Sequence, residues 1–341
     1  MSELSLQAPT EAESPVVFFT NGLGDNFLNL PALRALSYLF RDRLTLLRAE
    51  GSHEFLFDDL VLQKQIATSM RSTDEGRIFS ASDLSSCIER CDLFISLVPW
   101  RSTSLIELVK SCRPDVSVGF FKDFDIHLPL DYGKHSAELA FDIVRLFDSS
   151  LSISQFSNPP PLPEHSVTRA EELLAALPPG SKVLAVHADT LREKMWPADR
   201  WVIILDRFLS EHQNFWVLVL GGTPQALDVG AHGERVIPCF GLPFSVSLAL
   251  LAKADLFIGV DSCMLHGADF FRVPAVGLFG PTRAHEFGFL FGPNITLQAA
   301  SRMDKIDAET VYCALESLLV NPHQHVYWTV DDGKSVCACD T

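Results

Sequence analysis

Residues 256–282 read LFIGVDSCMLHGADFFRVPAVGLFGPT, and this stretch indicates the class of fold. Two apolar runs, at 256–260 and 275–279, are joined by a polar break and a short helical segment. Buried strands this close together, with a helix between them, predict a βαβ unit whose strands are parallel. Ligands of open α/β sheets bind beyond the carboxyl ends of the strands. The first candidate site residues are therefore those of the polar break: Asp261, Ser262 and Cys263.

The composition limits the class of protein. With 341 residues, the chain exceeds the size at which one hydrophobic core usually keeps growing, so we expect two domains. No apolar run approaches the ~18 residues that span a bilayer, and the N-terminus lacks the features of a signal peptide. We therefore expect a cytoplasmic protein. The net charge of −16 disfavours nucleic acid as a partner and leaves at most peripheral contact with a membrane.

The eight cysteines include no CxxC pair, so neither a metal site nor a disulfide framework is predicted. The CxC pattern of Cys337 and Cys339 is too weak a signal to change this expectation.

Alternating strands and helices on both sides of a proline-rich segment predict two α/β domains, each a doubly wound parallel sheet. The segment SNPPPLPEHS should be a semi-rigid linker, across which the domains face each other over a cleft. The predicted boundaries are a disordered tail at 1–14, a first domain at 15–156, the linker at 157–166, a second domain at 167–320, and a tail at 321–341 that packs back on the body.

The first domain opens with a buried strand, a glycine-bearing turn and a helix. Gly22 and Gly24 resemble the start of a dinucleotide fingerprint, but the third glycine position holds Phe27. Asp25 would also place a carboxylate where a pyrophosphate should lie. An acidic side chain at the carboxyl end of a strand, on a backbone kept thin by glycines, is well placed to act as a general base. The alternative is that Asp25 only caps the helix.

Three parts of the second domain could converge on one anion. The helix after Asp261 presents free N–H groups and a positive dipole end, which suit a phosphate. Lys194 and Thr190 lie in a polar loop beyond a strand, and His266 lies one helical turn after Ser262. Together they describe a cradle for a diphosphate. The alternatives are that Lys194 is a solvated surface charge and that His266 is a packed, half-buried histidine.

Asp261 needs a different role, because a carboxylate beside a bound diphosphate would be repelled. Hydrogen bonding to sugar hydroxyls is the obvious task. This points to a nucleotide-sugar donor in the second domain and an acceptor in the first, with Asp25 on the acceptor side.

Several spaced segments give the chain a resemblance to a known family. VDSCMLHGADFFRVPAVGLFGPT resembles the C-terminal signature of the family 9 glycosyltransferases, the ADP-heptose:lipopolysaccharide heptosyltransferases. GLGDNFLNLPALRAL is similar to the N-terminal segment of that family, and HADTLREKMWPADRW is similar to its segment with a lysine before Trp-Pro. KHSAE, which begins at Lys134, is similar to a weaker H-x-x-E element. The segments extend over both domains in the order of the family.

The resemblance implies a GT-B fold and an inverting, metal-independent glycosyl transfer without a cofactor. The donor would be a nucleotide-diphosphate sugar, with ADP-heptose as the leading candidate. Asp25 would be the general base, Lys194 would hold the diphosphate, Asp261 would bind hydroxyls of the donor sugar, and His266 would stand near the leaving diphosphate. The donor-side set is Thr190, Lys194, Gly222, Asp261, Ser262, Cys263 and His266, and the acceptor-side set is Gly24, Asn26, Arg101, Lys122, Lys134 and His135.

The chain departs from the family pattern. Cys263 replaces a glycine, and the turn after Gly222 holds Thr-Pro-Gln where an acidic ribose-binding residue is expected. The first domain is acidic overall, whereas an acceptor with lipid-anchored phosphates calls for a basic site. Two alternatives therefore stay open. One is transfer of another nucleotide-linked sugar to a peptide, a natural product or another glycan, and the other is a non-catalytic scaffold that binds a nucleotide sugar.

Overall fold

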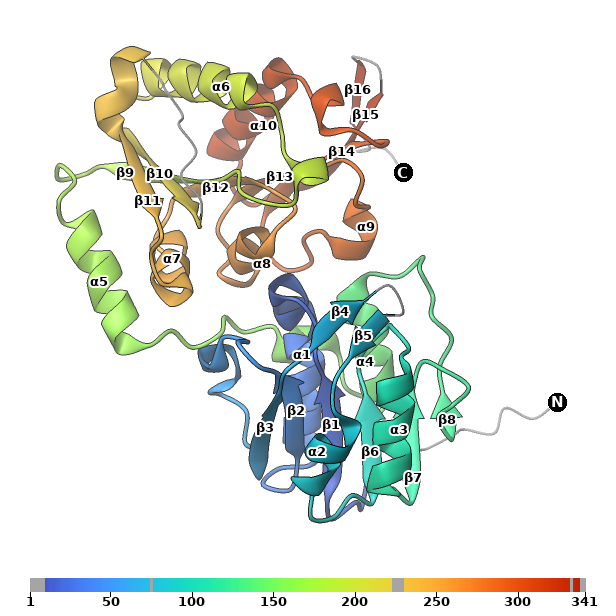
Figure 1. Cartoon of the computed structure of the whole chain (residues 1–341). Coiled ribbons are helices and arrows are strands. Elements are labelled where there is room, and N and C mark those ends of the chain that lie inside the picture. Colours follow the sequence, from blue (N-terminus) through green and yellow to red (C-terminus); the bar gives the residue numbers. More distant parts are fainter. Residues whose placement is uncertain (1–9, 74–75, 223–229, 332–333, 338–341) are drawn as a thin grey trace. The chain divides into compact units, whose positions relative to one another are not determined.

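The computed structural model describes residues 10–73, 76–222, 230–331 and 334–337 of the chain (Figure 1). The chain forms two compact units, residues 1–157 and 158–341, and each is built on its own sheet. Within the described residues, no helix is long and apolar enough to cross a membrane. Of the two cysteines in the C-terminal CxC pattern, Cys339 lies outside the described residues.

The first unit contains a six-stranded parallel sheet in the order β3-β2-β1-β6-β7-β8. Its strands are β1 Pro15–Phe19, β2 Thr45–Ala49, β3 Lys64–Thr68, β6 Leu93–Ser96, β7 Val116–Gly119 and β8 Ile126–His127. Its α-helices are α1 Leu23–Leu39, α2 Ala81–Ser86, α3 Thr103–Cys112 and α4 Ser136–Arg145, and a hairpin is formed by β4 Arg71–Thr73 and β5 Gly76–Ile78. The strand order reverses between β1 and β6, which is where sheets of this kind bind ligands.

Helices cover both faces of the first sheet (Figure 1). On one face, Phe18 and Phe94 of the sheet pack against Leu84 of α2 and Leu105 of α3. On the other face, α1 packs against α4. Helix α1 continues through Pro31, and every residue from 26 to 37 is buried, so packing on all sides stabilises a helix that lacks one backbone donor.

The second unit contains an eight-stranded sheet in the order β11-β10-β9-β12-β13-β14-β15-β16, parallel except for the last pair. Its strands are β9 Lys182–His187, β10 Phe215–Gly221, β11 Val236–Phe240, β12 Leu256–Val260, β13 Ala275–Phe279, β14 Asn294–Ala299, β15 His325–Asp331 and β16 Lys334–Cys337. Its α-helices are α5 Glu164–Leu174, α6 Ala198–Glu211, α7 Phe244–Leu251, α8 Cys263–Phe270, α9 Ala284–Phe287 and α10 Ala308–Val320. Here the order reverses between β9 and β12.

The core of the second unit explains why its strands read as continuous apolar runs. Val186, Ile258 and Leu278 of the sheet pack against residues of α6 and α10, including Phe208 and Leu315. On the other face, α7 packs against α5 and α8. A parallel sheet covered by helices on both faces buries both sides of each central strand. The predicted class, two doubly wound parallel sheets of Rossmann type, is confirmed.

The ends of the chain differ from the prediction. Residues 1–9 of the expected disordered tail lie outside the described residues, but Ala12 is buried and the amides of Glu13 and Ser14 donate to Asp92. The expected disorder is therefore wrong for 12–14.

The predicted linker and C-terminal tail also contain regular structure. Helix α5 begins at Glu164, inside the predicted linker. The predicted tail supplies β15, which pairs in parallel with β14 and so extends the sheet.

Candidate active site

The described part of the second unit brings three predicted site residues together where the strand order reverses. The Lys194 ammonium lies 2.6 Å from Oδ2 of Asp261, and the Thr190 hydroxyl donates to the Asp261 carbonyl at 3.1 Å. Thr190 and Lys194 follow β9, whereas Asp261 follows β12, so neighbouring parallel strands deliver them to the same edge. Lys194 is thus not a solvated surface charge. Its side chain is 25% exposed, and that of Asp261 is 8% exposed.

This ion pair joins two residues to which the prediction gave separate roles. Lys194 and Asp261 were expected to act on different parts of the donor, the diphosphate and the sugar. The structure instead pairs the two side chains, so the charge of Lys194 is compensated by the carboxylate of Asp261. A carboxylate that remains paired beside a bound anion is less repulsive than an isolated one.

The amino terminus of α8 supplies further donors at the same edge. Ser262 is the N-cap, and its hydroxyl is buried without a hydrogen-bond partner in the described structure. Cys263 is the first residue of the helix, and burial raises the pKa of its thiol to about 12. At neutral pH the thiol is therefore uncharged. The cysteine that replaces the family's glycine adds bulk to this helix end but no negative charge.

His266 lies one turn further along α8, and only 4% of its side chain is exposed. This burial favours the alternative that His266 packs inside the unit. Its predicted place beside a leaving diphosphate stays a prediction.

Asp189 is a residue of this edge that the sequence reading missed. It directly follows the buried end of β9, and its Oδ2 accepts a hydrogen bond from the amide of Gly222 at 3.1 Å. The predicted site glycine is thus joined to a carboxylate from the neighbouring strand end. The sequence HADT indicated this position, because Asp189 is the first polar residue after Ala188. The prediction named only Thr190 and Lys194 of this loop.

In the first unit, Asp25 lies in the first turn of α1, immediately beyond β1. Its Oδ2 accepts the Gly22 amide at 3.1 Å, and Gly22 is the N-cap of the helix. The alternative that Asp25 caps the helix is therefore wrong about the N-cap position, which Gly22 holds. It is right that the Asp25 side chain contacts this end of the helix. Gly24 and Asn26 share this turn, where Asn26 is buried and its backbone N–H donates to the Gly22 carbonyl.

An arginine at the carboxyl end of β1 was also missed. Arg77 of β5 donates to the Thr20 carbonyl and to Oδ1 of Asn21, each at 2.9 Å, and its guanidinium lies 5.2 Å from the centre of the Trp100 ring. The Trp100 indole donates to the same Asn21 oxygen at 2.7 Å. No carboxylate of the described chain pairs with Arg77. Arg77 therefore brings a guanidinium to the residues that follow β1.

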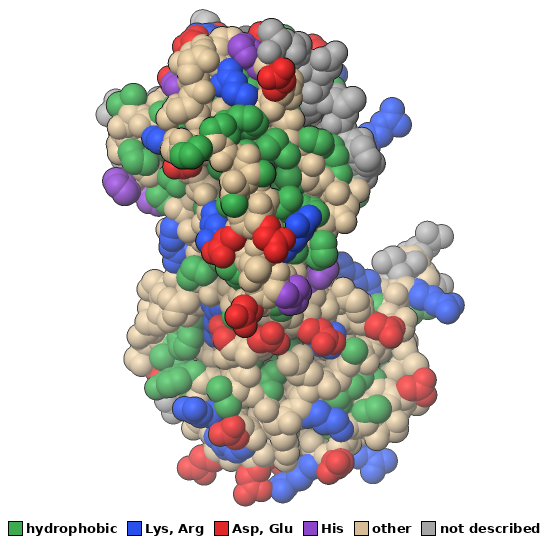
Figure 2. Space-filling model, turned by 90° about the vertical axis from the view of Figure 1, so that its left-hand side faces the viewer, with side chains coloured by type: hydrophobic (Ala, Val, Ile, Leu, Met, Phe, Trp, Pro, Cys, Tyr) green, Lys and Arg blue, Asp and Glu red, His purple; other side chains and the backbone are tan. Residues whose placement is uncertain are grey.

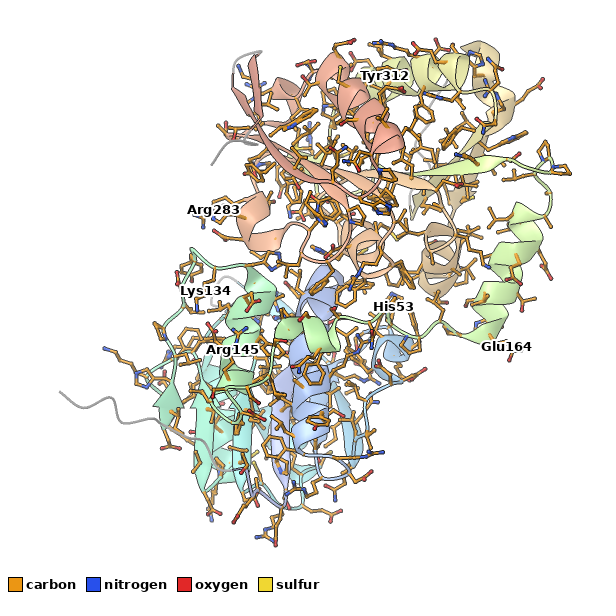
Figure 3. The ribbon with its side chains drawn as sticks, turned by 180° about the vertical axis from the view of Figure 1, so that it is seen from behind. His53, Lys134, Arg145, Glu164, Arg283 and Tyr312 are labelled. Atoms are coloured by element: carbon orange, nitrogen blue, oxygen red, sulfur yellow. The ribbon has the colours of Figure 1, made fainter. Side chains whose placement is uncertain are left out.

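The predicted acceptor-side cations have other partners. Arg101 makes two hydrogen bonds to Asp123, at 2.7 and 2.8 Å, which lower the pKa of that carboxyl. Lys134, labelled in Figure 3, pairs with Asp142, and the two charged atoms are 2.6 Å apart. Lys122 is exposed beyond β7. Carboxylates also dominate part of the face of the first unit that Figure 2 shows.

His135 and Glu138, the two residues of the H-x-x-E element, both support helix α4. His135 is its N-cap and accepts the Ala137 amide through Nδ1 at 3.2 Å. Glu138 pairs with Arg145 near the end of the helix at 2.7 Å. Among the described residues, no group of three or more His, Cys, Asp or Glu side chains is arranged to hold a metal ion.

Three solved structures share the fold of the chain. A family 9 glycosyl transferase from Veillonella parvula superposes with a TM-score of 0.76 at 18% identity, covering 92% of this chain and 99% of the other. Escherichia coli ADP-heptose lipopolysaccharide heptosyltransferase II gives 0.67 at 14% identity, covering 91% and 99%. Escherichia coli heptosyltransferase WaaC with ADP gives 0.64 at 15% identity, covering 89% and 99%.

A search of curated protein sequences finds no match. The profile of glycosyltransferase family 9 (heptosyltransferase) matches residues 134–312, which is more than half of the chain. The matched range includes Lys194, Asp261 and His266, whereas Asp25 precedes it. The chain shares the fold of these structures, the GT-B fold with two Rossmann-like domains, as predicted. The chain therefore belongs to glycosyltransferase family 9 and is a glycosyltransferase.

Proposed function

We propose that this enzyme transfers a sugar from a nucleotide-diphosphate sugar to an acceptor hydroxyl with inversion and without a metal ion. The observation that carries the proposal is the group formed by Lys194, Asp261 and the amino terminus of α8 at the reversal of the second sheet. ADP-heptose is the leading donor candidate, because similar folds are those of a heptosyltransferase with ADP and of an ADP-heptose lipopolysaccharide heptosyltransferase.

The second unit would stabilise the leaving group. As the bond between the anomeric carbon and the phosphate oxygen breaks, negative charge grows on the departing diphosphate. The Lys194 ammonium, the Thr190 hydroxyl and the amides at the start of α8 can stabilise that charge without a metal ion. Asp261, which remains next to Lys194, would accept hydrogen bonds from hydroxyls of the donor sugar.

The first unit would supply the base. Asp25 would take the proton of the acceptor hydroxyl while that oxygen bonds to the anomeric carbon from the face opposite the diphosphate. Attack from the opposite face inverts the configuration at this carbon. Arg77 and Trp100, which both donate to the side chain of Asn21 after β1, would offer an acceptor a charge partner and an aromatic surface.

The base assignment predicts a specific loss of rate. Asp25→Asn removes the proton acceptor but keeps an oxygen that can accept the Gly22 amide, so the helix should remain intact. We expect kcat to fall by roughly 100- to 10,000-fold while nucleotide affinity and melting temperature stay near those of the wild type. Full activity of Asp25→Asn, with donor and acceptor verified, would contradict the assignment.

The diphosphate assignment predicts a loss of donor affinity. Lys194→Ala removes the ammonium and leaves Asp261 as a nearly buried, unpaired carboxylate beside the anion. We expect nucleotide diphosphate to bind at least about 10-fold more weakly, in line with loss of a charged hydrogen bond. Isothermal titration of the single variants and of Lys194→Ala with Asp261→Ala measures this. Partial recovery in the double variant is expected, and unchanged affinity in Lys194→Ala would contradict the role.

A second candidate keeps the reaction and changes the substrates. Cys263 and the carboxylate-rich first unit favour a donor or acceptor different from those of lipopolysaccharide core synthesis. Thermal shifts with ADP, GDP, UDP and CDP and their sugars separate the two candidates, because a dominant ADP response favours ADP-heptose. Transfer that persists in EDTA would support metal independence, and loss that Mg²⁺ restores would contradict it.

A further inference from the structure

We propose that Cys91 and Cys112 of the first unit form a reversible disulfide when a hydroperoxide oxidises the protein. Both cysteines are free thiols in the structure. They are far apart in the sequence and belong to no CxxC pattern, so their spacing does not indicate a pair. The pair is independent of the proposed glycosyl transfer, and its test can fail without affecting that function.

The path of the chain brings the two cysteines to the same edge of the first sheet. Cys91 lies two residues before β6, and Cys112 is the last residue of α3, which covers this part of the sheet (Figure 1). Three residues, beginning with Arg113 in the left-handed conformation, lead from the helix to β7, which pairs in parallel with β6. The Val116 amide at the start of β7 donates to the Asp92 carbonyl at 3.1 Å. This pairing holds the end of α3 beside Cys91.

The two side chains interact in the core of the unit. Cys91 belongs to the buried cluster between the sheet and helices α2 and α3, and the half-buried Cys112 packs against that cluster. The Cys91 thiol has two acceptors, the Leu93 carbonyl at 3.6 Å and the sulfur of Cys112. Because the sulfur atoms already share a hydrogen bond, rotations of the two side chains should bring them to the S–S bond length of about 2 Å.

The two thiols differ in the way that an attacking and a resolving cysteine require. The hydrogen bond from Cys91 lowers the pKa of the Cys112 thiol, which is also the more exposed of the two. The hydrogen bond to Cys112, together with burial, raises the pKa of the Cys91 thiol. Thiolate character and access decide which cysteine reacts first with a hydroperoxide. Cys112 is therefore the attacking cysteine.

The reaction consumes one hydroperoxide and two thiols. The Cys112 thiolate attacks a peroxide oxygen, the O–O bond breaks, and the departing oxygen takes a proton and leaves as water or an alcohol. The Cys91 sulfur then attacks the sulfenic acid at Cys112, so that the S–S bond forms, the S–O bond breaks, and water leaves with the Cys91 proton. Two electrons pass from the sulfurs to the peroxide, and a dithiol reductant restores both thiols.

The bond would close residues 91–112 into a covalent loop that contains β6 and α3. Such cross-links stabilise a protein mainly by restricting its unfolded chain. We expect the oxidised protein to melt at least about 3 °C above the reduced protein. Cys91 lies at the amino end of β6, whereas Asp25 and Trp100 follow the carboxyl ends of β1 and β6, so the rate of glycosyl transfer should not change.

Peptide mapping of the folded, full-length protein locates the bond. Trypsin separates the three cysteines of this region into the peptides 78–90 with Cys87, 91–101 with Cys91, and 111–122 with Cys112. After treatment with hydrogen peroxide and blocking of the remaining thiols, we expect the second and third peptides as one linked species that dithiothreitol separates. The first peptide should stay unlinked, although its cysteine is exposed.

Single substitutions separate the roles of the two thiols. Cys91→Ala should leave a sulfenic acid at Cys112 that dimedone traps, and Cys112→Ala should abolish the linked species. Cys87→Ala is the matched control, because it removes an exposed thiol from the same region, and it should behave as the wild type. The melting temperature of each reduced variant reports its fold.

Three results would overturn the proposal, and the first two need only the wild-type protein. One is the absence of the linked species while peroxide oxidises Cys112 to sulfinic acid. Another is a bond from Cys112 to Cys87 in place of Cys91. The third is dimedone labelling of Cys91 in Cys112→Ala without labelling of Cys112 in Cys91→Ala, which would reverse the order of attack.

Discussion

Cys263 stands where the resemblance to the family led us to expect a glycine. Its side chain stands at the first position of α8, where a glycine would leave the backbone amides open to a ligand. Cys263→Gly should therefore bind nucleotide diphosphate several-fold more tightly than the wild type, with a loss in helix stability of no more than about 1 kcal/mol. Isothermal titration measures the affinity, and Cys313→Ala, a change of an exposed cysteine, is the control.

The pKa of the Cys263 thiol adds a pH criterion to that prediction. Burial raises this pKa to about 12, so the thiol stays protonated between pH 6 and 9. The increase in nucleotide affinity of Cys263→Gly over the wild type should consequently be the same at pH 6 and pH 9. A gain that appears only at high pH would mean that an ionised thiol repels the ligand. Weaker binding at all pH values would mean that the cysteine contributes to the site.

Helix α8 owes its position to a buried carboxylate on its far end. Asp269 is 4% exposed and accepts the amides of Leu290, Phe291 and Gly292, at distances of 3.0, 2.8 and 2.6 Å. Asp269→Asn would turn an NH₂ group towards one of these donors. We expect the free energy of unfolding to fall by about 2–4 kcal/mol, measured by urea denaturation. Asp199→Asn serves as the exposed control, and a loss below about 1 kcal/mol would contradict this role.

Strands could be predicted well from the sequence where a continuous apolar run ended at a clear polar break. β12 and β13 have the predicted bounds, because each strand is a continuous apolar run that is buried on both faces. β14 was not predicted. Its sequence, NITLQA, is short and mixes polar and apolar residues, so the strand depends on its neighbours β13 and β15.

The site was predictable only to the level of strand ends. That Thr190, Lys194 and Asp261 share one edge follows from parallel strand topology. That Lys194 pairs with Asp261 does not follow, because the two residues are 67 positions apart and the pairing depends on side-chain geometry. Arg77 was missed for the same reason, since its contacts to Thr20 and Asn21 join segments that no local pattern connects.

The charge of the whole molecule sets the conditions for an anionic substrate. With a net charge of −16, the enzyme repels such an acceptor at long range. At saturating donor, kcat/KM for an acceptor bearing phosphate or carboxylate should rise as ionic strength increases from about 0.01 to 0.15 M, since the screening length shrinks from ~30 to ~8 Å. Steady-state rates in NaCl measure this, with a neutral acceptor as the control. A falling kcat/KM would show that local cations such as Arg77 dominate the encounter.

Hydrogen bonds anchor both ends of the loop that follows β9, residues 188–196. At its start, the buried His187 bonds the Leu220 carbonyl at 2.9 Å, and at its end the Trp196 indole donates to the Ile306 carbonyl at 2.8 Å. Between these anchors lie Asp189, which accepts the Gly222 amide, and Lys194, which pairs with Asp261. Because both of its ends are fixed, the loop can be exchanged as one piece for the corresponding loop of a relative. Such an exchange should change donor preference and leave the sheet beneath the loop intact.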